Sequence, residues 1–201
     1  MATLLLIRHG ENDFVGRRLA GHLPGVHLNA KGRYQAEAVA AMLRHEPVIA
    51  IYSSPMERTM ETAGPLARDL YLPVTPVPGL TEVDFGAWQG KTISYLKRLK
   101  LWQVVQKAPS RARFPGGESF PEAQARVVAA LEAINAAHGD KERVACFSHS
   151  DTIRLAVAHY LDMPLDSFQR ITIHPASITR IHIEKGAIFV LRVNQAAIPG
   201  D

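Results

Sequence analysis

The chain has 201 residues, 47% of them hydrophobic and 21% charged, a composition and length that predict one globular domain over residues 1–201. Its net charge of +4 suits a small anionic substrate, but no clustered basic stripe or RNA-binding aromatic motif is present, so no nucleic-acid partner is expected. The single cysteine, Cys146, excludes an internal disulfide. The apolar stretch before Arg8 is too short for a signal peptide or a membrane span, so we expect a cytoplasmic protein without membrane contact.

In the first quarter of the chain, a buried strand is expected at residues 4–7, followed by a polar loop over residues 10–28. Asn29 then caps a helix, and a second strand follows at residues 48–52. The apolar face of that helix recurs at helical spacing and consists of Ala36, Val39, Ala40 and Leu43.

The next helix is predicted to begin at a capping box in which Ser54 is the cap, Pro55 the first helical residue and Glu57 the closing acid. Gly64-Pro65 is expected to bend or interrupt this helix. An edge strand follows at residues 74–77, because prolines bracket it. The face predicted to line the core of this helix comprises Met56, Met60, Ala63, Ala67 and Leu70.

In the second half of the chain, short apolar strands again alternate with longer segments of helical periodicity. We expect a peripheral amphipathic helix (92–107), a glycine loop (115–117), a helix capped by Ser119 and ending near His138, a strand (143–148), a helix (151–161) and a β-hairpin (178–183 and 187–193, turning at 185–186). The fold class predicted is therefore α/β: a single-domain three-layer sandwich with a mostly parallel central sheet, helices on both faces and a C-terminal β-hairpin.

Polar residues that can take part in binding or catalysis directly follow three of the predicted strands. Arg8 and His9 follow the first strand, Ser53, Ser54 and Arg58 follow the second, and Ser148 and His149 follow the strand at 143–148. Ligands of open α/β sheets bind beyond the carboxyl ends of the strands, so these side chains are expected to meet in one crevice.

Each of these residues also has a structural alternative. An arginine and a histidine after a strand can simply begin a polar loop, and His149 can be a satisfied core histidine. Arg58 near a helix start opposes the helix dipole, which favours a bound anion as its partner. Glu82, in a stretch that mixes acids with apolar residues, is either a salt-bridge partner or a proton donor. The remaining histidines are assigned structural or solvated roles, with His22 a partial exception because it lies in the first long loop.

Five motifs in order resemble those of the histidine phosphatase superfamily, also called phosphoglycerate-mutase-like, over nearly the whole chain. They are Arg8-His9-Gly10-Glu11, the segment from Ser53 to Ala63, the segment from Leu80 to Gly90, the loop from Pro115 to Ser119, and Ser148-His149 through Ile153-Arg154. A match to the first motif alone is weak, whereas five in order make an accidental match very improbable.

The resemblance implies a role for each residue. His9 is the nucleophile that becomes phosphorylated, Arg8, Arg58 and His149 surround the phosphoryl group, and Glu82 is the general acid and base. Two guanidinium groups suit the phosphoryl oxygens, so neither a metal nor another cofactor is expected.

Two departures from the family pattern concern substrate contacts. Val15 stands where the family commonly has an asparagine, and Asn12 is a candidate substitute. Ser150-Asp151 replaces a common Gly-Gly pair; we expect Asp151 to cap the following helix and leave Ser150 open as a hydroxyl donor. Asn12, Ser150 and Gly21 are therefore the further candidate substrate-binding residues.

The function expected first is a metal-independent phosphomonoesterase acting on a small phosphorylated metabolite. Its rivals are a cofactor-dependent phosphoglycerate mutase with the same site, a protein phosphohistidine phosphatase, and a non-catalytic binding module on this fold. Only about two dozen residues separate Gly90 from Pro115, fewer than typical mutases of the family have, which favours the phosphatase. The segments expected to choose the substrate are residues 10–28 and 92–110, and the oligomeric state is open, with a homodimer as one alternative.

Overall fold

One six-stranded mixed sheet forms the centre of the computed structural model, which describes residues 2–184 and 187–197. Its spatial order is β3-β2-β4-β1-β5-β6. The first four of these strands are mutually parallel, β5 pairs antiparallel with β1, and β6 pairs antiparallel with β5. The strands are β1 (Thr3–Arg8), β2 (Val48–Ser53), β3 (Val74–Pro76), β4 (Arg143–Ser148), β5 (Ile178–Glu184) and β6 (Ala187–Gln195).

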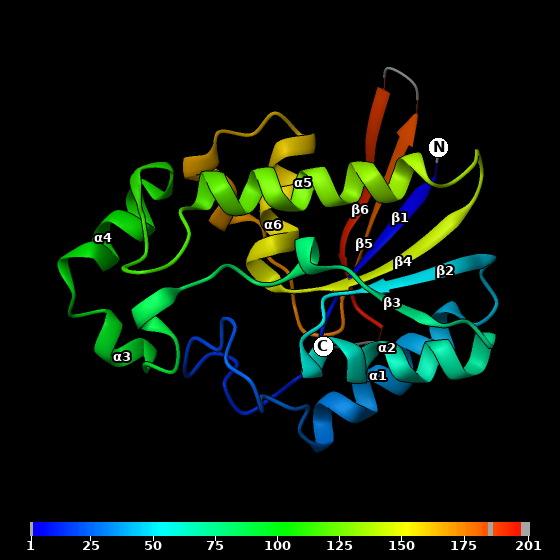
Figure 1. Ribbon diagram of the computed structural model, residues 1–201, viewed down its shortest axis with the longest axis horizontal. Helices are drawn as coiled ribbons and strands as arrows, with labels where there is room; N and C mark the ends of the chain where they lie inside the picture. Colours follow the sequence, from blue (N-terminus) through cyan, green and yellow to red (C-terminus); the bar gives the residue numbers. More distant parts are fainter. Residues whose placement is uncertain (1, 185–186, 198–201) are drawn as a thin grey trace.

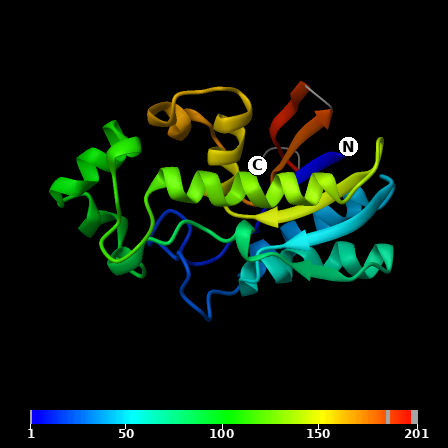
Figure 2. The ribbon, with the colours of Figure 1, turned by 45° about the horizontal axis from the view of Figure 1, so that its top comes forward.

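Helices cover both faces of this sheet, as Figure 1 shows: α1 and α2 lie below it in that view, and α5 and α6 above it. The helices are α1 (Ala30–Leu43), α2 (Glu57–Leu70), α3 (Ile93–Leu96), α4 (Lys100–Lys107), α5 (Phe120–Ala136) and α6 (Ser150–Tyr160). The short helices α3 and α4 extend to one side, beyond the end of α5, in both ribbon views (Figures 1 and 2).

The apolar run of β1 is uninterrupted because both faces of the strand are buried. Leu4 and Leu6 belong to the core under α5 and α6, whereas Leu5 and Ile7 belong to the core under α1 and α2. Successive side chains of a strand point to opposite faces, so a central parallel strand needs apolar residues at every position. The three-layer α/β fold with a C-terminal hairpin, expected from the sequence, is confirmed.

Several local predictions are also confirmed. The side chain of Asn29 accepts a hydrogen bond from the Gly32 N–H and caps α1, and Ser119 and Glu122 form the capping box that begins α5. The hairpin strands β5 and β6 form as expected, while the predicted turn at 185–186 lies outside the described residues. Within the described part of the chain, no helix is long and apolar enough to cross a membrane.

The predicted start of α2 is wrong. The helix begins at Glu57, with Met56 at the cap position and no side-chain cap bond, because Ser54 and Glu57 are engaged elsewhere. The Ser54 hydroxyl lies 2.8 Å from His149 Nε2, and the Glu57 carboxylate accepts a hydrogen bond from the Gly25 N–H.

Two further predictions for α2 concern its course and its buried face. The helix runs through Pro65 without interruption, so the predicted interruption at Gly64-Pro65 is wrong, and the alternative of a bend stays a prediction. Its buried face is rotated from the predicted one toward the polar site and consists of Arg58, Thr59, Thr62, Ala63 and Leu66.

The predicted helix over 92–107 is two helices. Leu99 has an extended backbone, with φ −81° and ψ 140°, and separates α3 from α4. This break lets Leu96 and Val105, which lie on different helices, both reach the same core. Asp151 is likewise not a cap: His149 occupies the cap position of α6, and the Asp151 carboxylate accepts a hydrogen bond from Arg154.

Candidate active site

His9 lies directly after β1, at the carboxyl edge of the sheet. Its backbone N–H donates to the Ser148 carbonyl at 3.0 Å, which joins the ends of β1 and β4. Its side chain is 5% exposed, and Nδ1 lies 2.7 Å from the Gly10 carbonyl oxygen. A carbonyl only accepts, so Nδ1 carries the proton and Nε2 keeps its lone pair. Burial lowers the pKa of His9 well below its ordinary value, and the charges of Arg58 and Arg8 lower it further, so the ring is neutral near pH 7.

The position of His9 depends on the glycine that follows it. A Cβ added to Gly10 would lie 2.6 Å from the Gly32 carbonyl oxygen, in the first turn of α1. The Gly10 N–H also donates to the Thr62 hydroxyl of α2 at 3.0 Å. The turn after β1 is thus pressed between two helices, and only glycine fits at this point.

Arg58 and His149 contact each other beside His9. The Arg58 guanidinium is 1% exposed; its Nη2 donates to the Gly21 carbonyl at 2.8 Å and lies 3.2 Å from His149 Nδ1. Because arginine only donates, Nδ1 of His149 is an acceptor, and its Nε2–H donates to the Ser54 hydroxyl. The rings of His9 and His149 meet edge to face with centroids 5.3 Å apart. Burial lowers the pKa of both His149 and Arg58.

A cavity of about 400 Å³ opens onto these residues. Its wall includes Arg8, His9, Arg58 and Glu82, from three separate segments of the chain. Arg8 is fixed by one nitrogen, because its Nη1 donates to the Ile173 carbonyl at 2.7 Å, while its buried Nε has no hydrogen-bond partner among the described residues. His149, fully buried behind Arg58, is not part of the wall.

Glu82 is the carboxyl group of this cavity. It is 8% exposed, and its Oε1 accepts hydrogen bonds from the Val83 N–H at 3.0 Å and the Thr152 hydroxyl at 3.2 Å. Burial raises the pKa of Glu82, and the nearby charge of Asp151 raises it further. Both effects shift the equilibrium toward the protonated carboxyl, and Oε2 is the oxygen placed to carry the proton, because Oε1 accepts from the Val83 N–H and shares the Thr152 hydroxyl with the Thr81 carbonyl, which lies 2.8 Å from it.

The backbone around Glu82 is held from two sides. The Glu82 carbonyl accepts hydrogen bonds from His22 Nε2 at 2.6 Å and from the Arg126 guanidinium at 3.2 Å. Arg126, on α5, also binds the Gly79 and Thr81 carbonyls and pairs with Glu118 at 2.8 Å. The position of the Glu82 side chain is thus coupled to α5 and to the long loop after β1.

A model of the histidine phosphatase superfamily (branch 1) matches residues 4–196, which is nearly the whole chain. The chain belongs to this superfamily. The match confirms the resemblance seen in the five motifs and gives this histidine phosphatase its enzyme class, that of the phosphatases that hydrolyse phosphoric monoesters.

Relatives of two activities resemble this histidine phosphatase. Phosphoserine phosphatase 1 of Hydrogenobacter thermophilus is 30% identical and aligns with 96% of this chain and 92% of its own. The 2,3-bisphosphoglycerate-dependent phosphoglycerate mutase of Thermoplasma acidophilum is also 30% identical, over 95% and 92% of the two chains. A mycobacterial glucosyl-3-phosphoglycerate phosphatase, solved with VO3, superposes with a TM-score of 0.87 at 25% identity over 96% and 99%.

The other predicted substrate contacts of this histidine phosphatase all lie on the cavity wall, as does Val15. The Asn12 side chain accepts hydrogen bonds from the Phe14 and Val15 N–H groups and so shapes the start of the loop. Gly21 contributes its carbonyl to Arg58, and Ser150 is the first residue of α6. Their contacts with a substrate stay predictions.

Two arginines of the wall, Arg18 and Arg154, received no role in the sequence analysis. Arg18 lies in the loop of residues 10–28, where no periodicity orients a side chain. Arg154 could have been found, because it follows Ser150 by four residues and shares its helix face. Apolar side chains complete the wall, namely Phe14, Val15, Leu19, Phe85 and Ile93.

Across residues 2–184 and 187–197, no group of three or more His, Cys, Asp and Glu side chains is placed to hold a metal ion. The positive charge of the cavity comes instead from the guanidinium groups of its wall.

Proposed function

We propose that this chain is a phosphomonoesterase that hydrolyses a small phosphorylated metabolite through a phosphohistidine at His9. The observation that carries the proposal is the state of the His9 ring. Its Nδ1–H is committed to the Gly10 carbonyl, and its Nε2 lone pair belongs to a neutral ring on the wall of an arginine-lined cavity. An uncharged imidazole nitrogen so placed is a nucleophile for phosphorus.

The reaction has two steps. In the first, Nε2 of His9 forms a bond to phosphorus, the ester P–O bond breaks, and Glu82 donates its proton to the departing alkoxide oxygen. In the second, the Glu82 carboxylate takes a proton from water, the water oxygen bonds to phosphorus, and the P–N bond breaks to release phosphate. The raised pKa of Glu82 supports its first role, because the acid must hold a proton before the ester bond breaks.

Arg8 and Arg58 bind the phosphoryl oxygens in this proposal. Arg8 is tethered through Nη1 only, which leaves its Nε and Nη2 edge for a forked contact with an oxyanion. Phosphoryl transfer depends on positioning and charge stabilisation, so loss of one such donor is expected to reduce kcat roughly 100- to 1,000-fold.

His149 acts first as a positioning residue. In this structure its Nδ1 accepts a hydrogen bond from Arg58, and its Nε2–H is committed to Ser54. Both ring nitrogens hold Arg58 and the start of α2 in place. The direct donation to the phosphoryl group that the family resemblance implies requires His149 to exchange its contact with Arg58 for one with substrate.

The short segment between the Glu82 segment and the glycine loop favours water over a phosphoglycerate as the acceptor of the phosphoryl group. Residues 91–114, between the Glu82 segment and the glycine loop, form only α3, α4 and a short 3₁₀ turn (Pro109–Arg111). The mutases that the sequence motifs resemble typically carry additional segments in this region, but the Thermoplasma acidophilum mutase aligns with this chain over 92% of its own length, so the isomerisation assay decides between the two acceptors. A phosphatase of protein phosphohistidine is disfavoured because small members of that kind lack the Glu82 segment.

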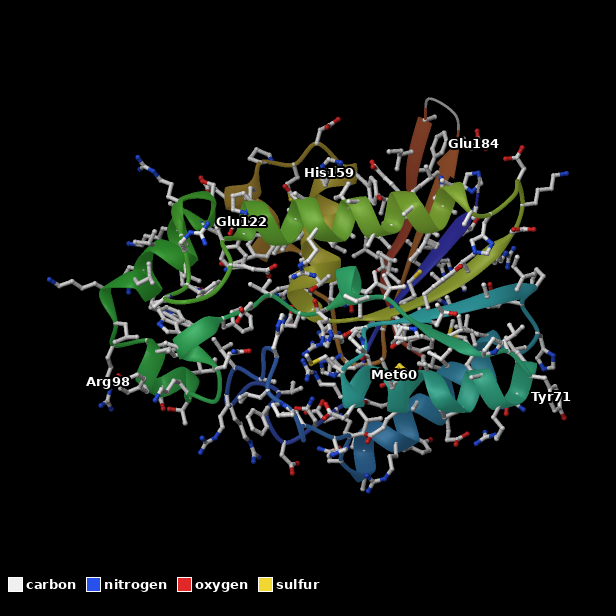
Figure 3. The ribbon with its side chains drawn as sticks, in the orientation of Figure 1. Met60, Tyr71, Arg98, Glu122, His159 and Glu184 are labelled. Atoms are coloured by element: carbon white, nitrogen blue, oxygen red, sulfur yellow. The ribbon has the colours of Figure 1, made fainter. Side chains whose placement is uncertain are left out.

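The test is release of inorganic phosphate from p-nitrophenyl phosphate and a panel of phosphorylated metabolites, with and without EDTA, beside isomerisation of 3-phosphoglycerate. We expect phosphate release that EDTA does not abolish, no isomerisation, and loss of turnover in His9→Ala. His159→Ala is the matched control, because His159 is exposed at the far end of α6 (Figure 3). A His9→Ala variant that keeps most of its activity would refute the proposal.

A further inference from the structure

The cavity holds more positive charge than a phosphoryl group needs. Four arginines line it, namely Arg8, Arg18, Arg58 and Arg154, against the two carboxyl groups of Glu82 and Asp151. In the first step of the proposed function Glu82 holds the proton that it donates, so at that stage a single ionised carboxylate, that of Asp151, opposes four guanidinium groups. A phosphate dianion compensates two of the three remaining charges. One positive charge is left for another part of the substrate.

Of the four arginines, Arg154 is the one best placed to bind a second anionic group of the substrate. Its Nη1 donates to Asp151 Oδ1 at 3.0 Å, and its buried Nε has no hydrogen-bond partner among the described residues. Arg8 shows the same pattern, with Nη1 engaged and Nε unpartnered. In both residues the buried Nε makes no hydrogen bond among the described residues, and Nη1 is the nitrogen that is engaged; the parallel N–H groups of the Nε and Nη2 pair match the two oxygens of a carboxylate or phosphate.

Asp151 fixes the direction of that edge. It lies three residues before Arg154 on the first turns of α6, so the two side chains share one helix face. Both are only about a quarter exposed, which restricts the guanidinium more than a surface ion pair would. Arg18 is different, because it is exposed and its Nη1 donates to the Gly90 carbonyl at the rim.

We propose that Arg154, positioned by Asp151, binds a carboxylate on the alcohol part of the substrate, which makes the substrate a phosphate monoester of a hydroxy acid. The inference rests on the proposed function, since it assigns the second anionic group of the ester that His9 attacks. A carboxylate, with one negative charge, matches the single uncompensated positive charge better than a second phosphate dianion does.

The experiment compares two esters that differ by one charge, O-phospholactate and O-phospholactamide. We expect wild-type kcat/KM to be roughly 10- to 100-fold higher for the carboxylate, the size of a charge-assisted hydrogen-bonded contact. Arg154→Gln should reduce this ratio to within a few-fold of unity, and Asp151→Asn should reduce it by less. Arg192→Gln is the matched control, because Arg192 is exposed on the edge strand β6, outside the cavity wall and outside both segments expected to choose the substrate, and should leave the ratio unchanged.

Each other outcome has a definite meaning. Equal wild-type kcat/KM for the two esters overturns the inference while leaving the phosphatase in place. A ratio that survives Arg154→Gln but is lost in Arg18→Gln, or an equal loss on both esters in Arg154→Gln, overturns the assignment to Arg154. The wild-type comparison needs no variant, so it decides the substrate class even if Arg154→Gln fails to fold. No turnover of any ester, p-nitrophenyl phosphate included, would refute the proposed function and this inference together.

Discussion

In the proposed mechanism, replacing Glu82 by glutamine removes the proton donor while keeping most of the contacts of the side chain. The glutamine carbonyl oxygen can still accept from the Val83 N–H and the Thr152 hydroxyl, the two bonds that hold Oε1. What disappears is the acidic proton on the other oxygen. A general acid typically contributes 100- to 10,000-fold, which corresponds to about 2.7–5.4 kcal/mol of barrier, and the contribution grows as the leaving alkoxide becomes more basic.

The assay for Glu82→Gln is kcat/KM across p-nitrophenyl, phenyl and ethyl phosphate, because this parameter reports the transfer to His9 and not the later hydrolysis. We expect the ethyl ester to lose about 100- to 10,000-fold and the p-nitrophenyl ester less than about 10-fold. Slow hydrolysis of the phosphoenzyme should also give a burst of p-nitrophenol of one equivalent per site. Equal losses across the three esters would remove Glu82 from proton transfer.

Two further predictions concern stability. Burial lowers the pKa of His9 and His149, so below pH 6.5 the unfolded chain binds more protons than the folded chain. The free energy of unfolding, measured with urea, should therefore fall from pH 7 to pH 5, and it should fall less steeply in His9→Gln. An unchanged pH dependence in this variant contradicts the buried, neutral His9 ring. Gly10→Ala should lower the free energy of unfolding by about 1–3 kcal/mol and reduce activity, because the added Cβ meets the Gly32 backbone. Gly64→Ala, whose added Cβ has nothing within 4 Å, should raise the free energy of unfolding by about 0.5–1 kcal/mol. Equal shifts of the two melting temperatures would contradict this reasoning.

The layers of the fold were predictable because burial determines residue type there. The strand β1 is apolar at every position since both of its faces are covered, and Asn29 and Ser119 cap helices with bonds to their own first turns. Such signals involve residues close in the sequence. They need no knowledge of the rest of the chain.

Predictions failed where a distant contact takes a group that the local rule had assigned. The sequence spacing of Ser54 and Glu57 fits a capping box, but the serine hydroxyl accepts a hydrogen bond from His149 and the glutamate carboxylate accepts one from the Gly25 N–H. Asp151 has a cap-forming side chain, yet it binds Arg154 instead. The same limit applied to the cavity: the strand ends pointed to Arg8, His9 and their partners, whereas the wall formed by residues 10–28 depends on loop geometry that no periodicity encodes.

The strand order has a consequence for how the protein matures during synthesis. The first two strands to leave the ribosome, β1 and β2, never pair with each other, because β4 is inserted between them. β2 can pair with β3 once that strand has emerged, but the neighbours of β1 are β4 and β5, so residues 143–148 must emerge before β1 can join β2 in one sheet and before the ends carrying His9 and Arg58 are drawn together. A nascent chain that stops short of β4 holds His9, the proposed nucleophile, and Arg58 on segments that are not yet joined, so the site assembles late and in a single event.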